Sequence, residues 1–327
     1  MERAGGRDRG SAVRGRLLSH VLRYPRGACG PVRGTLDTGG QPLRFGIVGH
    51  PVDHSLSPVL HAALAAELGI ALVYERHDVP EPNALAPTLA ALAARGVQGV
   101  NVTLPHKCAA LRLARRRTAV AERAGAANTL RLGGGGAPVV LEAHNTDVAG
   151  FARSLREAGV AVCDREVLVL GAGGAARAVL LALERLGAGR VVVASRRRPG
   201  TAGCPAVPPL AGLEYVPWQE RERWAERAAV VINATPLGML PRAQDCPLER
   251  VRFRPEQAVA DLVYRPLETA LLARARAAGA QAVDGLGMLV HQGIDALGFW
   301  LGREESEPER ARLARAGRAA LQAALVG

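Results

Sequence analysis

The stretch EVLVLGAGGAARAVLLALERLGAGRVVVASR, residues 166–196, decides the fold. It opens with alternating Val and Leu, continues with a glycine-rich turn and an apolar helical pattern, and ends in a second run of valines. A strand, turn, helix and strand within about thirty residues form the unit that binds a dinucleotide. The glycines let the backbone approach a pyrophosphate, and the helix N-terminus presents free N–H groups to it. The alternative is a purely structural turn, but the context is the one the motif requires, so we expect a Rossmann-type domain.

The end of the second strand indicates which dinucleotide is bound. A domain that selects NAD usually has an acidic residue near this point, whereas NADP needs cations for its 2′-phosphate. Here Arg196, Arg197 and Arg198 supply three guanidinium groups without a nearby carboxylate. Guanidinium pairs with phosphate in a bidentate manner, so we expect NADP(H) as the cofactor. The alternative is an ordinary run of surface charge.

Strands and helices alternate on both sides of this unit. Apolar runs predict strands at 44–49, 72–79, 99–104, 126–132, 138–145, 229–235 and 258–264. Helical spacing predicts helices at 57–69, 82–96, 106–116, 151–159, 269–279, 287–302 and 307–327. Ser57 is expected to cap the first helix, and GGGGAP at 133–138 is expected to form a hairpin tip. The chain is therefore predicted to be an α/β protein with two units, 44–147 and 148–285.

The first 43 residues are rich in Arg and Gly and lack a signal-peptide core. We interpret residues 1–43 as a disordered leader or the product of an upstream start codon. An organelle transit peptide is the alternative, although Glu2, Asp8 and Asp37 speak against it.

Composition excludes several classes of protein. The net charge of +12 is spread along the chain and aromatic residues make up 3%, so no nucleic-acid-binding module is visible. The five cysteines are scattered without a CxxC pair, which argues against a disulfide framework or a metal site and favours a reducing cytoplasm. On this cysteine usage we expect a cytoplasmic protein. No apolar run is long enough to suggest a membrane span.

Lys107 is the only lysine among 42 basic residues. Arginine cannot exchange its proton near neutral pH, whereas lysine can take part in proton transfer. Chance survival of one lysine in an arginine-biased chain is the alternative. We nevertheless regard Lys107 as a candidate for proton chemistry.

Three motifs of the first unit place polar side chains where apolar ones would suit a core better. HSLSP contains Ser55 and Ser57, and NVTLPHK brings Asn101, Thr103 and Lys107 to a strand end. NTD, residues 145–147, adds an amide, a hydroxyl and a carboxylate. Each alone could be a helix cap or an Asx-turn. Together they supply the groups needed to bind a polyhydroxylated acid.

With these motifs the chain resembles the shikimate dehydrogenase family. GHPVDHSLSP, NVTLPHK, GAANT, NTD, GAGGAAR, INATPLGM, DLVYRP and DGLGMLVHQ occur in that family's order between about residues 44 and 305. The resemblance implies NADPH-dependent, reversible reduction of 3-dehydroshikimate to shikimate, a step of chorismate and aromatic amino acid biosynthesis. It also implies a substrate domain at 44–147 and an NADP-binding Rossmann domain at 148–285, with helices of 286–327 returning to the substrate domain.

The resemblance assigns roles to individual residues. Lys107 is expected to donate and accept the proton, with Asp147 as its partner, and both are expected to bind substrate. The other residues expected to bind substrate are Ser55, Ser57, Thr103, Asn128, Tyr264 and Gln292. The residues expected to bind the cofactor are Gly171, Ala172, Gly173, Gly174, Ala175, Ser195, Arg196, Arg197, Leu262 and Gly285. No metal and no macromolecular partner is expected, and the chain could be a monomer or a homodimer.

Four positions depart from the family pattern. Val148 and Ala143 stand where glycine is common, so the junction beside NTD is expected to be more crowded. Ser195 and Arg197 replace the commoner Asn and Thr, which affects cofactor affinity. Three alternatives stay open: a quinate or quinate/shikimate dehydrogenase using NAD(P), an aminoshikimate-type enzyme, and a non-catalytic shikimate-binding regulatory module. Loss of the lysine or the aspartate would mark the last, and both are present.

Overall fold

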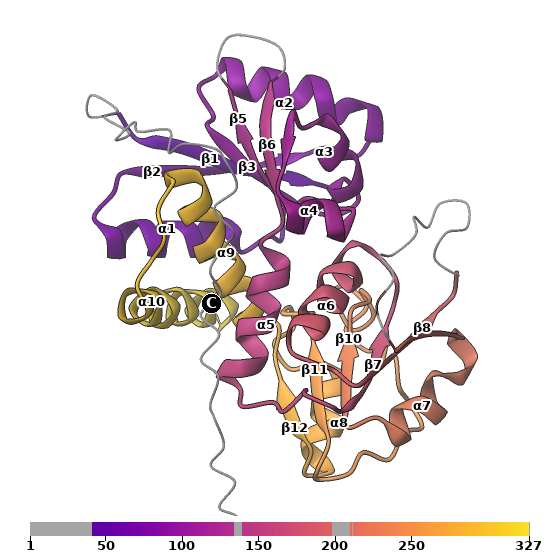
Figure 1. Ribbon diagram of the computed structural model, residues 1–327. Coiled ribbons are helices and arrows are strands. Elements are labelled where there is room, and N and C mark those ends of the chain that lie inside the picture. The colour runs from indigo at the N-terminus through magenta and orange to yellow at the C-terminus, as the bar shows by residue number, and fades with distance from the viewer. Residues whose placement is uncertain (1–40, 134–138, 198–209, 211, 327) are drawn as a thin grey trace, which may run out of the picture. The chain divides into compact units, whose positions relative to one another are not determined.

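The computed structural model describes residues 41–133, 139–197, 210 and 212–326. The described residues form two six-stranded sheets (Figure 1). All but residues 41–43 of the predicted leader lie outside the described residues, as do Arg198 and most of the predicted hairpin tip. Leu43, which we expected in the leader, instead begins the first strand and is buried.

The first sheet has the strand order β2-β1-β3-β5-β6-β4. Its strands are β1 (Leu43–Gly49), β2 (Leu72–Asp78), β3 (Gly99–Val102), β4 (Arg116–Arg117), β5 (Thr129–Leu132) and β6 (Val140–His144). β5 runs antiparallel to both of its neighbours, and the remaining pairs of adjacent strands are parallel. The carboxyl ends of β1, β3 and β6 therefore lie at the same edge as the amino end of β5.

Helices cover both faces of this sheet. The helices that lie near it in sequence are α1 (Ser57–Leu68), α2 (Leu85–Ala94), α3 (Lys107–Leu113) and α4 (Ala119–Ala124). The 3₁₀ turn η1 (Pro82–Ala84) precedes α2. One core beneath α2 contains Leu85, Leu89, Val100 and Leu130. Because these side chains are apolar at helical and strand spacing, their burial holds the layer together.

The second core of this sheet includes the end of the chain. Leu60 and Leu64 of α1 pack with Val290 and Leu297 of α9 (Leu286–Leu301) and with Leu313 of α10 (Glu307–Val326). Figure 1 shows α9 and α10, coloured towards yellow, beside the indigo α1. The expected return of the terminal helices to the first sheet is thus confirmed.

The second sheet is entirely parallel and has the order β12-β11-β10-β7-β8-β9. Its strands are β7 (Glu166–Leu170), β8 (Arg190–Ser195), β9 (Leu213–Pro217), β10 (Val230–Asn233), β11 (Ala258–Asp261) and β12 (Gln281–Val283). Numbered from β7, this is the 3-2-1-4-5-6 order of a doubly wound dinucleotide-binding sheet. The predicted Rossmann-type fold is confirmed.

Helices also enclose the second sheet on both faces. They are α6 (Gly174–Arg185), α7 (Arg221–Arg227) and α8 (Ala270–Ala277), with η2 (Trp218–Glu220) before α7. One core joins Val179 and Leu183 of α6 to Val167, and the other joins Leu271 and Trp224 to Leu168. Such burial on both faces explains why β7 and β8 read as continuous apolar runs.

Helix α5 (Asp147–Glu157) follows the first sheet and packs against α9. A Cβ added at Gly150 would lie 2.8 Å from the backbone nitrogen of Gln292. Glycine at this position therefore lets the two helices approach closely. Val148 and Ala143, the two bulkier departures from the family pattern, are both fully buried in the apolar cores.

Several local predictions differ from the structure. Ser57 is the first residue of α1 and its side chain makes no capping hydrogen bond, because it interacts with Ser55 instead. Helix α3 ends at Leu113, after which the chain extends into β4. β4, β9, β12, α4 and α7 were not predicted; each is short, so its periodic signal is weak.

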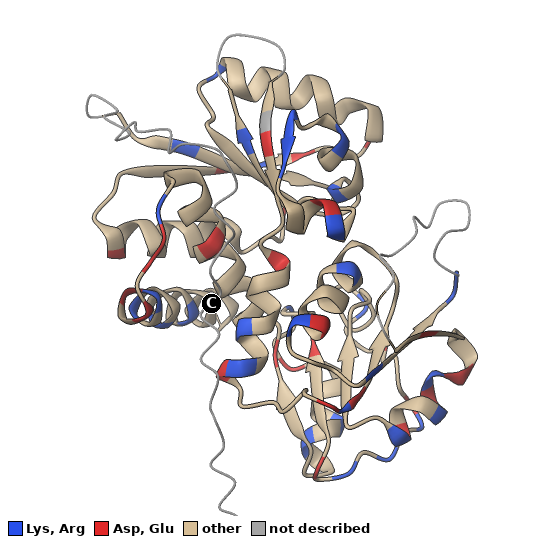
Figure 2. Ribbon diagram, in the orientation of Figure 1, with Lys and Arg blue, Asp and Glu red and all other residues tan. Residues whose placement is uncertain are grey.

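Among the described residues, charged side chains are spread over many elements. Figure 2 shows Lys and Arg in blue interspersed with Asp and Glu in red on elements of both sheets. Many form ion pairs on the surface, such as Arg123 with Glu184 and Arg303 with Glu309. Within the described residues, no helix is long and apolar enough to cross a membrane. Cys108, Cys163 and Cys246 are free thiols.

Candidate active site

Lys107 and Asp147 form an ion pair at one edge of the first sheet. Lys107 begins α3 just after β3, and Asp147 begins α5 just after β6. Since β3 and β6 run in the same direction, both chains leave the sheet at the same edge, and residues 40 apart in sequence meet. Lys107 Nζ lies 2.7 Å from Asp147 Oδ2, and the side chains are 14% and 6% exposed. Because the Lys107 ammonium is largely shielded from water, it is suited to stabilise an oxygen on which negative charge develops.

Asn128 hydrogen-bonds to the aspartate of this pair. It precedes the antiparallel β5 and so stands at the same edge. Its Nδ2 donates to Asp147 Oδ1 at 2.8 Å, while its Oδ1 accepts the backbone N–H of Thr146 at 2.8 Å. Both carboxylate oxygens of Asp147 are therefore hydrogen-bonded, one to Asn128 and one to Lys107. This fixes where the carboxylate presents its charge to the ammonium.

The two serines lie together at the start of α1. Ser55 Oγ donates to Ser57 Oγ at 3.2 Å, and both residues are buried. The guanidinium of Arg76 holds the loop, because its Nη2 donates to the carbonyl oxygen of Ser55 at 2.7 Å. Two hydroxyls beside a cationic side chain are suited to bind a carboxylate.

Three further predicted residues come from distant parts of the sequence. Gln292 of α9 lies next to Asn128, whose Nδ2 is 3.4 Å from Gln292 Oε1. Thr103 follows β3, and its backbone N–H donates to the carbonyl of Val48 at 2.9 Å. Tyr264 packs on the core that includes Leu56 and lies near Arg76; burial raises the pKa of its phenol. The structure thus brings Gln292 to Asn128, beside the Lys107–Asp147 pair, and Tyr264 to the serine loop.

The glycine-rich turn lies at the switch point of the second sheet, between β7 and β10. Gly171 has φ +99°, and a Cβ there would lie 2.9 Å from the Thr235 methyl group. Gly173 precedes α6 and a Cβ on it would meet nothing within 4 Å, whereas a Cβ on Gly174 would lie 3.5 Å from Lys107 Cδ. The turn therefore leaves open space at the N-terminus of a twelve-residue helix. A pyrophosphate fits there, on the free N–H groups.

Other residues predicted to bind the cofactor lie near this turn and at the end of β8. Ala172 and Ala175 are partly accessible, whereas the helix is buried from Ala176 onwards. Arg196 and Arg197 are exposed directly after β8, and Ser195 Oγ donates to the carbonyl of Arg197 at 2.7 Å. The serine thus shapes the loop that carries both guanidinium groups.

Leu262 and Gly285 meet at the ends of β11 and β12. A Cβ on Gly285 would lie 2.6 Å from the carbonyl oxygen of Leu262. Only glycine permits this approach of two backbones, because the obstacle is a main-chain atom. These two predicted cofactor residues therefore lie side by side, at the carboxyl edge of the second sheet.

A polar network in the INATPLGM and DLVY motifs was not predicted from the sequence. Asp261 accepts hydrogen bonds from Asn233 Nδ2 at 2.9 Å, from the Val263 N–H at 3.0 Å and from Thr269 Oγ1 at 2.8 Å. Asn233 Oδ1 in turn accepts from the Thr235 hydroxyl at 2.6 Å. Thr235 packs on Gly171, so the network holds the loop that contacts the glycine turn. The feature of the sequence that could have indicated this network is the carboxylate of Asp261 at the end of the otherwise apolar AVAD strand.

The titration of Asp261 gives a test of this network. Burial raises the pKa of Asp261 from 3.8 to about 6. Between about pH 4 and 6 the folded protein keeps a proton that the unfolded chain has released, so this group stabilises the fold less as pH rises. The free energy of unfolding of the wild type, minus that of Asp261→Asn, should fall by on the order of 2 kcal/mol between pH 4 and pH 7. Urea unfolding at several pH values measures it. The surface variant Asp164→Asn is the control, and a pH-independent difference for Asp261→Asn would contradict the assignment.

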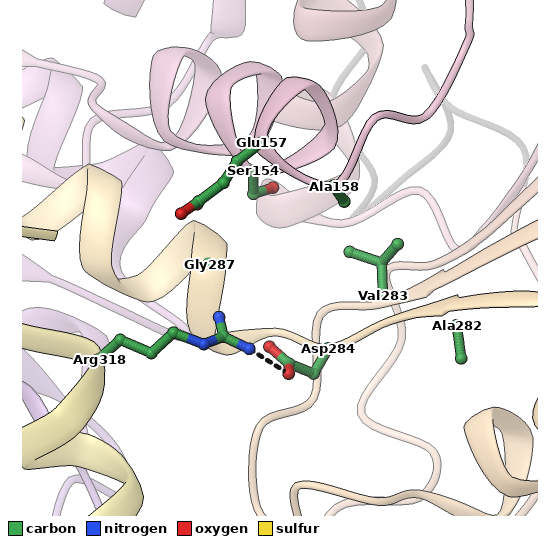
Figure 3. Close-up of a pocket in the computed structure, with 8 residues that line it drawn as sticks. All are labelled: Ser154, Glu157, Ala158, Ala282, Val283, Asp284, Gly287 and Arg318. Carbon is green, nitrogen blue, oxygen red and sulfur yellow. Dashed lines mark hydrogen bonds and ion pairs between the residues drawn. The ribbon is translucent and has the colours of Figure 1, made fainter. Parts of the chain in front are cut away.

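A cavity of about 240 Å³ lies elsewhere, where α5, β12, α9 and α10 meet (Figure 3). Ser154, Glu157, Asp284 and Arg318 supply its polar side chains. Its polar side chains have partners within the protein, since Arg318 Nη2 lies 2.6 Å from Asp284 Oδ2 and Glu157 Oε2 lies 2.8 Å from His291 Nε2. None of the predicted site residues lines this cavity. It is separate from the candidate active site.

A dinucleotide-binding sheet together with a largely buried lysine–aspartate pair is the arrangement expected of a pyridine-nucleotide-dependent oxidoreductase. Residues 47–130 match the family model of the shikimate dehydrogenase substrate binding domain. The NADP(+) shikimate dehydrogenase of Moorella thermoacetica is 45% identical over 263 residues, which cover 79% of this chain and 88% of that protein. The chain belongs to the shikimate dehydrogenase family. The resemblance inferred from the motifs is confirmed.

Other comparisons agree. The NADP(+) shikimate dehydrogenase of Symbiobacterium thermophilum is 44% identical, covering 79% of this chain and 89% of that protein. The crystal structure of the Thermus thermophilus shikimate 5-dehydrogenase in complex with NADP(H) and shikimate superposes with a TM-score of 0.70. It shares 38% identity over 85% of this chain and 99% of that one. A quinate dehydrogenase from Corynebacterium glutamicum in complex with NAD has the same TM-score, 0.70, at 30% identity, covering 84% of this chain and 98% of that one.

Proposed function

We propose that this protein catalyses the reversible, NADP-dependent reduction of 3-dehydroshikimate to shikimate. The observation that carries the proposal is the Lys107–Asp147 pair, 2.7 Å apart, with Gly174 of the dinucleotide turn next to the lysine side chain. Relatives at 45% and 44% identity bear the NADP shikimate dehydrogenase name, whereas the quinate dehydrogenase shares 30%. Arg196 and Arg197 support NADP over NAD.

In this proposal residues 44–147 and 286–327 bind the substrate, and residues 148–285 bind the cofactor. Ser55 and Ser57 hold the substrate carboxylate by hydroxyl hydrogen bonds. Thr103, Asn128, Tyr264 and Gln292 contact the ring hydroxyls and the carboxylate. Hydrogen-bond donors and acceptors from residues 55–128 and from Tyr264 and Gln292 thereby match the carboxylate and hydroxyl groups of the substrate.

For the chemical step, NADPH supplies the hydride when it is bound. Lys107 stabilises the negative charge that develops on the ketone oxygen and delivers a proton to it; in the reverse direction it accepts that proton. Asp147 orients the ammonium and receives a hydrogen bond from a ring hydroxyl. Asn128 holds Asp147 Oδ1, which keeps Oδ2 towards the lysine. An arginine at position 107 could stabilise the charge but could not release its proton.

In this proposal the cofactor is bound by backbone N–H groups and by guanidinium charge. The N–H groups at the start of α6 hold the pyrophosphate, in the turn formed by Gly171, Ala172, Gly173, Gly174 and Ala175. Ser195, Arg196 and Arg197 bind the 2′-phosphate, while Leu262 and Gly285 lie along the nicotinamide end. A monomeric or homodimeric state and a cytoplasmic location stay predictions.

A steady-state assay of purified protein tests the proposal. We expect shikimate with NADP to give the highest kcat/KM among the four combinations of shikimate or quinate with NADP or NAD. The guanidinium groups favour the 2′-phosphate and the polar site is built for a hydroxylated acid. Much faster oxidation of quinate with NAD would make the chain a quinate dehydrogenase. Binding of shikimate without turnover of any combination would favour the regulatory module.

A further inference from the structure

A chain of hydrogen bonds leads from β2 across the first sheet to the catalytic pair. Tyr74 Oη donates to Asn101 Oδ1 at 2.7 Å. Asn101 Nδ2 donates to the carbonyl oxygen of Asn128 and to Thr129 Oγ1, each at 3.2 Å. Asn128 then donates to Asp147, which holds Lys107. The strands β2, β1, β3 and β5 are consecutive in the sheet, so these hydrogen bonds run from the edge strand β2 to the fourth of its six strands.

The direction of this chain is fixed by its carbonyl group. The Asn128 carbonyl can only accept, so the Asn101 amide must turn its NH₂ group towards it. The amide oxygen of Asn101 then faces Tyr74, and the phenol must donate. Burial raises the pKa of Tyr74 well above its ordinary value of 10.0, so the phenol keeps the proton that it donates. Its oxygen can still accept a hydrogen bond, and Ser57 lies within reach.

The ring of Tyr74 is held by aromatic neighbours. It stacks on the ring of His61 with centroids 4.4 Å apart and planes 9° apart, and Trp300 packs on both at 5.5 and 6.4 Å. His61 is fully buried, and burial lowers its pKa to about 3, so its ring is neutral at pH 7. These contacts position the Tyr74 ring, and its hydroxyl makes the polar contact with Asn101.

Resting on the proposed function, we propose that Tyr74 is a positioning residue for this reaction: its hydroxyl, which lies near Ser57 of the serine loop, fixes the Asn101 amide, and that amide donates to the carbonyl of Asn128. Asn101 is 5% exposed, so without the hydroxyl its amide oxygen loses, inside the protein, the donor that lies 2.7 Å away. The amide then turns or admits water, and Asn128 loses the support that directs it towards Asp147. Neither Tyr74 nor Asn101 is required to touch the substrate for this effect.

The variant Tyr74→Phe tests the proposal, since it keeps the stacked ring and removes only the hydroxyl. We expect the KM for shikimate to rise about tenfold, the cost of one buried unsatisfied group. The KM for NADP should stay within about twofold, because the second sheet is untouched, and the Tm should be nearly unchanged. The matched control is Tyr215→Phe on β9 of the second sheet, which should leave the KM for shikimate at its wild-type value.

A double-mutant cycle separates positioning from a general loss of structure. Tyr74→Phe combined with Asn101→Ala should be no worse than Asn101→Ala alone, because the hydroxyl acts through that amide. Independent, multiplicative effects of the two changes would overturn the proposal, as would a Tyr74→Phe KM within twofold of wild type. The wild-type rates with shikimate and quinate test the proposed function separately. The variants are then measured with whichever of the two acids the wild type oxidises.

Discussion

Lys107→Ala should lower kcat by on the order of 100-fold or more, as expected when a general acid is lost. Lys107→Arg should recover little of that loss. Arginine keeps the positive charge next to Asp147 but cannot deliver its proton to the developing alkoxide. Steady-state kinetics in both directions, with the Tm as a measure of folding, check this result.

The control for Lys107 is Arg112→Ala, which removes an exposed cation from the same helix, α3, and should leave kcat unchanged. A normal kcat for Lys107→Ala would remove the lysine from the mechanism. A normal kcat for Lys107→Arg would leave it only an electrostatic role. In that case the proton would have to come from another group or from water.

Asp147→Asn should lower kcat by about 100-fold as well. The change is isosteric, yet it places an NH₂ group or a neutral oxygen at 2.7 Å from the Lys107 ammonium, where a carboxylate oxygen now stands. The ammonium then loses its charged partner in a nearly buried site and is no longer held towards the ketone oxygen. The KM for shikimate should rise too, because Asp147 is also proposed to bind a ring hydroxyl.

The double variant Lys107→Ala with Asp147→Asn sharpens this prediction. If Asp147 acts through the lysine, the double variant should be about as slow as Lys107→Ala alone, since groups that work as a unit are not additive. Glu122→Gln, an exposed carboxylate on α4, is the matched control. An Asp147→Asn enzyme with normal kcat and a raised KM would reduce the aspartate to a substrate-binding residue.

Motif order and composition predicted much of the candidate site. The sequence 166–196 identified the dinucleotide turn because a strand, its turn and its helix are contiguous and interact locally. Lys107 was singled out as the only lysine, and the structure places it on Asp147. The strand β4 and helix α7 were missed because two to seven residues carry too little periodicity.

The roles of Tyr74, Asn101, Asn233 and Asp261 could not be read in the same way. A tyrosine in β2 looks like an ordinary strand residue until its strand is placed two positions from β3. Asp261 ends a buried strand, but nothing local says that Asn233, 28 residues earlier, will face it. Asn233 and Asp261 meet because two adjacent parallel strands bring their carboxyl ends to one edge, and Tyr74 reaches Asn101 because only β1 separates their strands.

The sequence by itself determined the α/β class, the Rossmann-type unit and the list of polar residues from which the site is built. These follow from local periodicity and contiguous motifs, which the chain carries without knowledge of its neighbours. Only the tertiary structure decided that Lys107 lies 2.7 Å from Asp147 and that Gln292 joins Asn128. It alone showed that Tyr74 is linked through Asn101 to Asn128, and so to the Lys107–Asp147 pair. Strand order, direction and the return of α9 set those distances, and they depend on the packing of the whole chain.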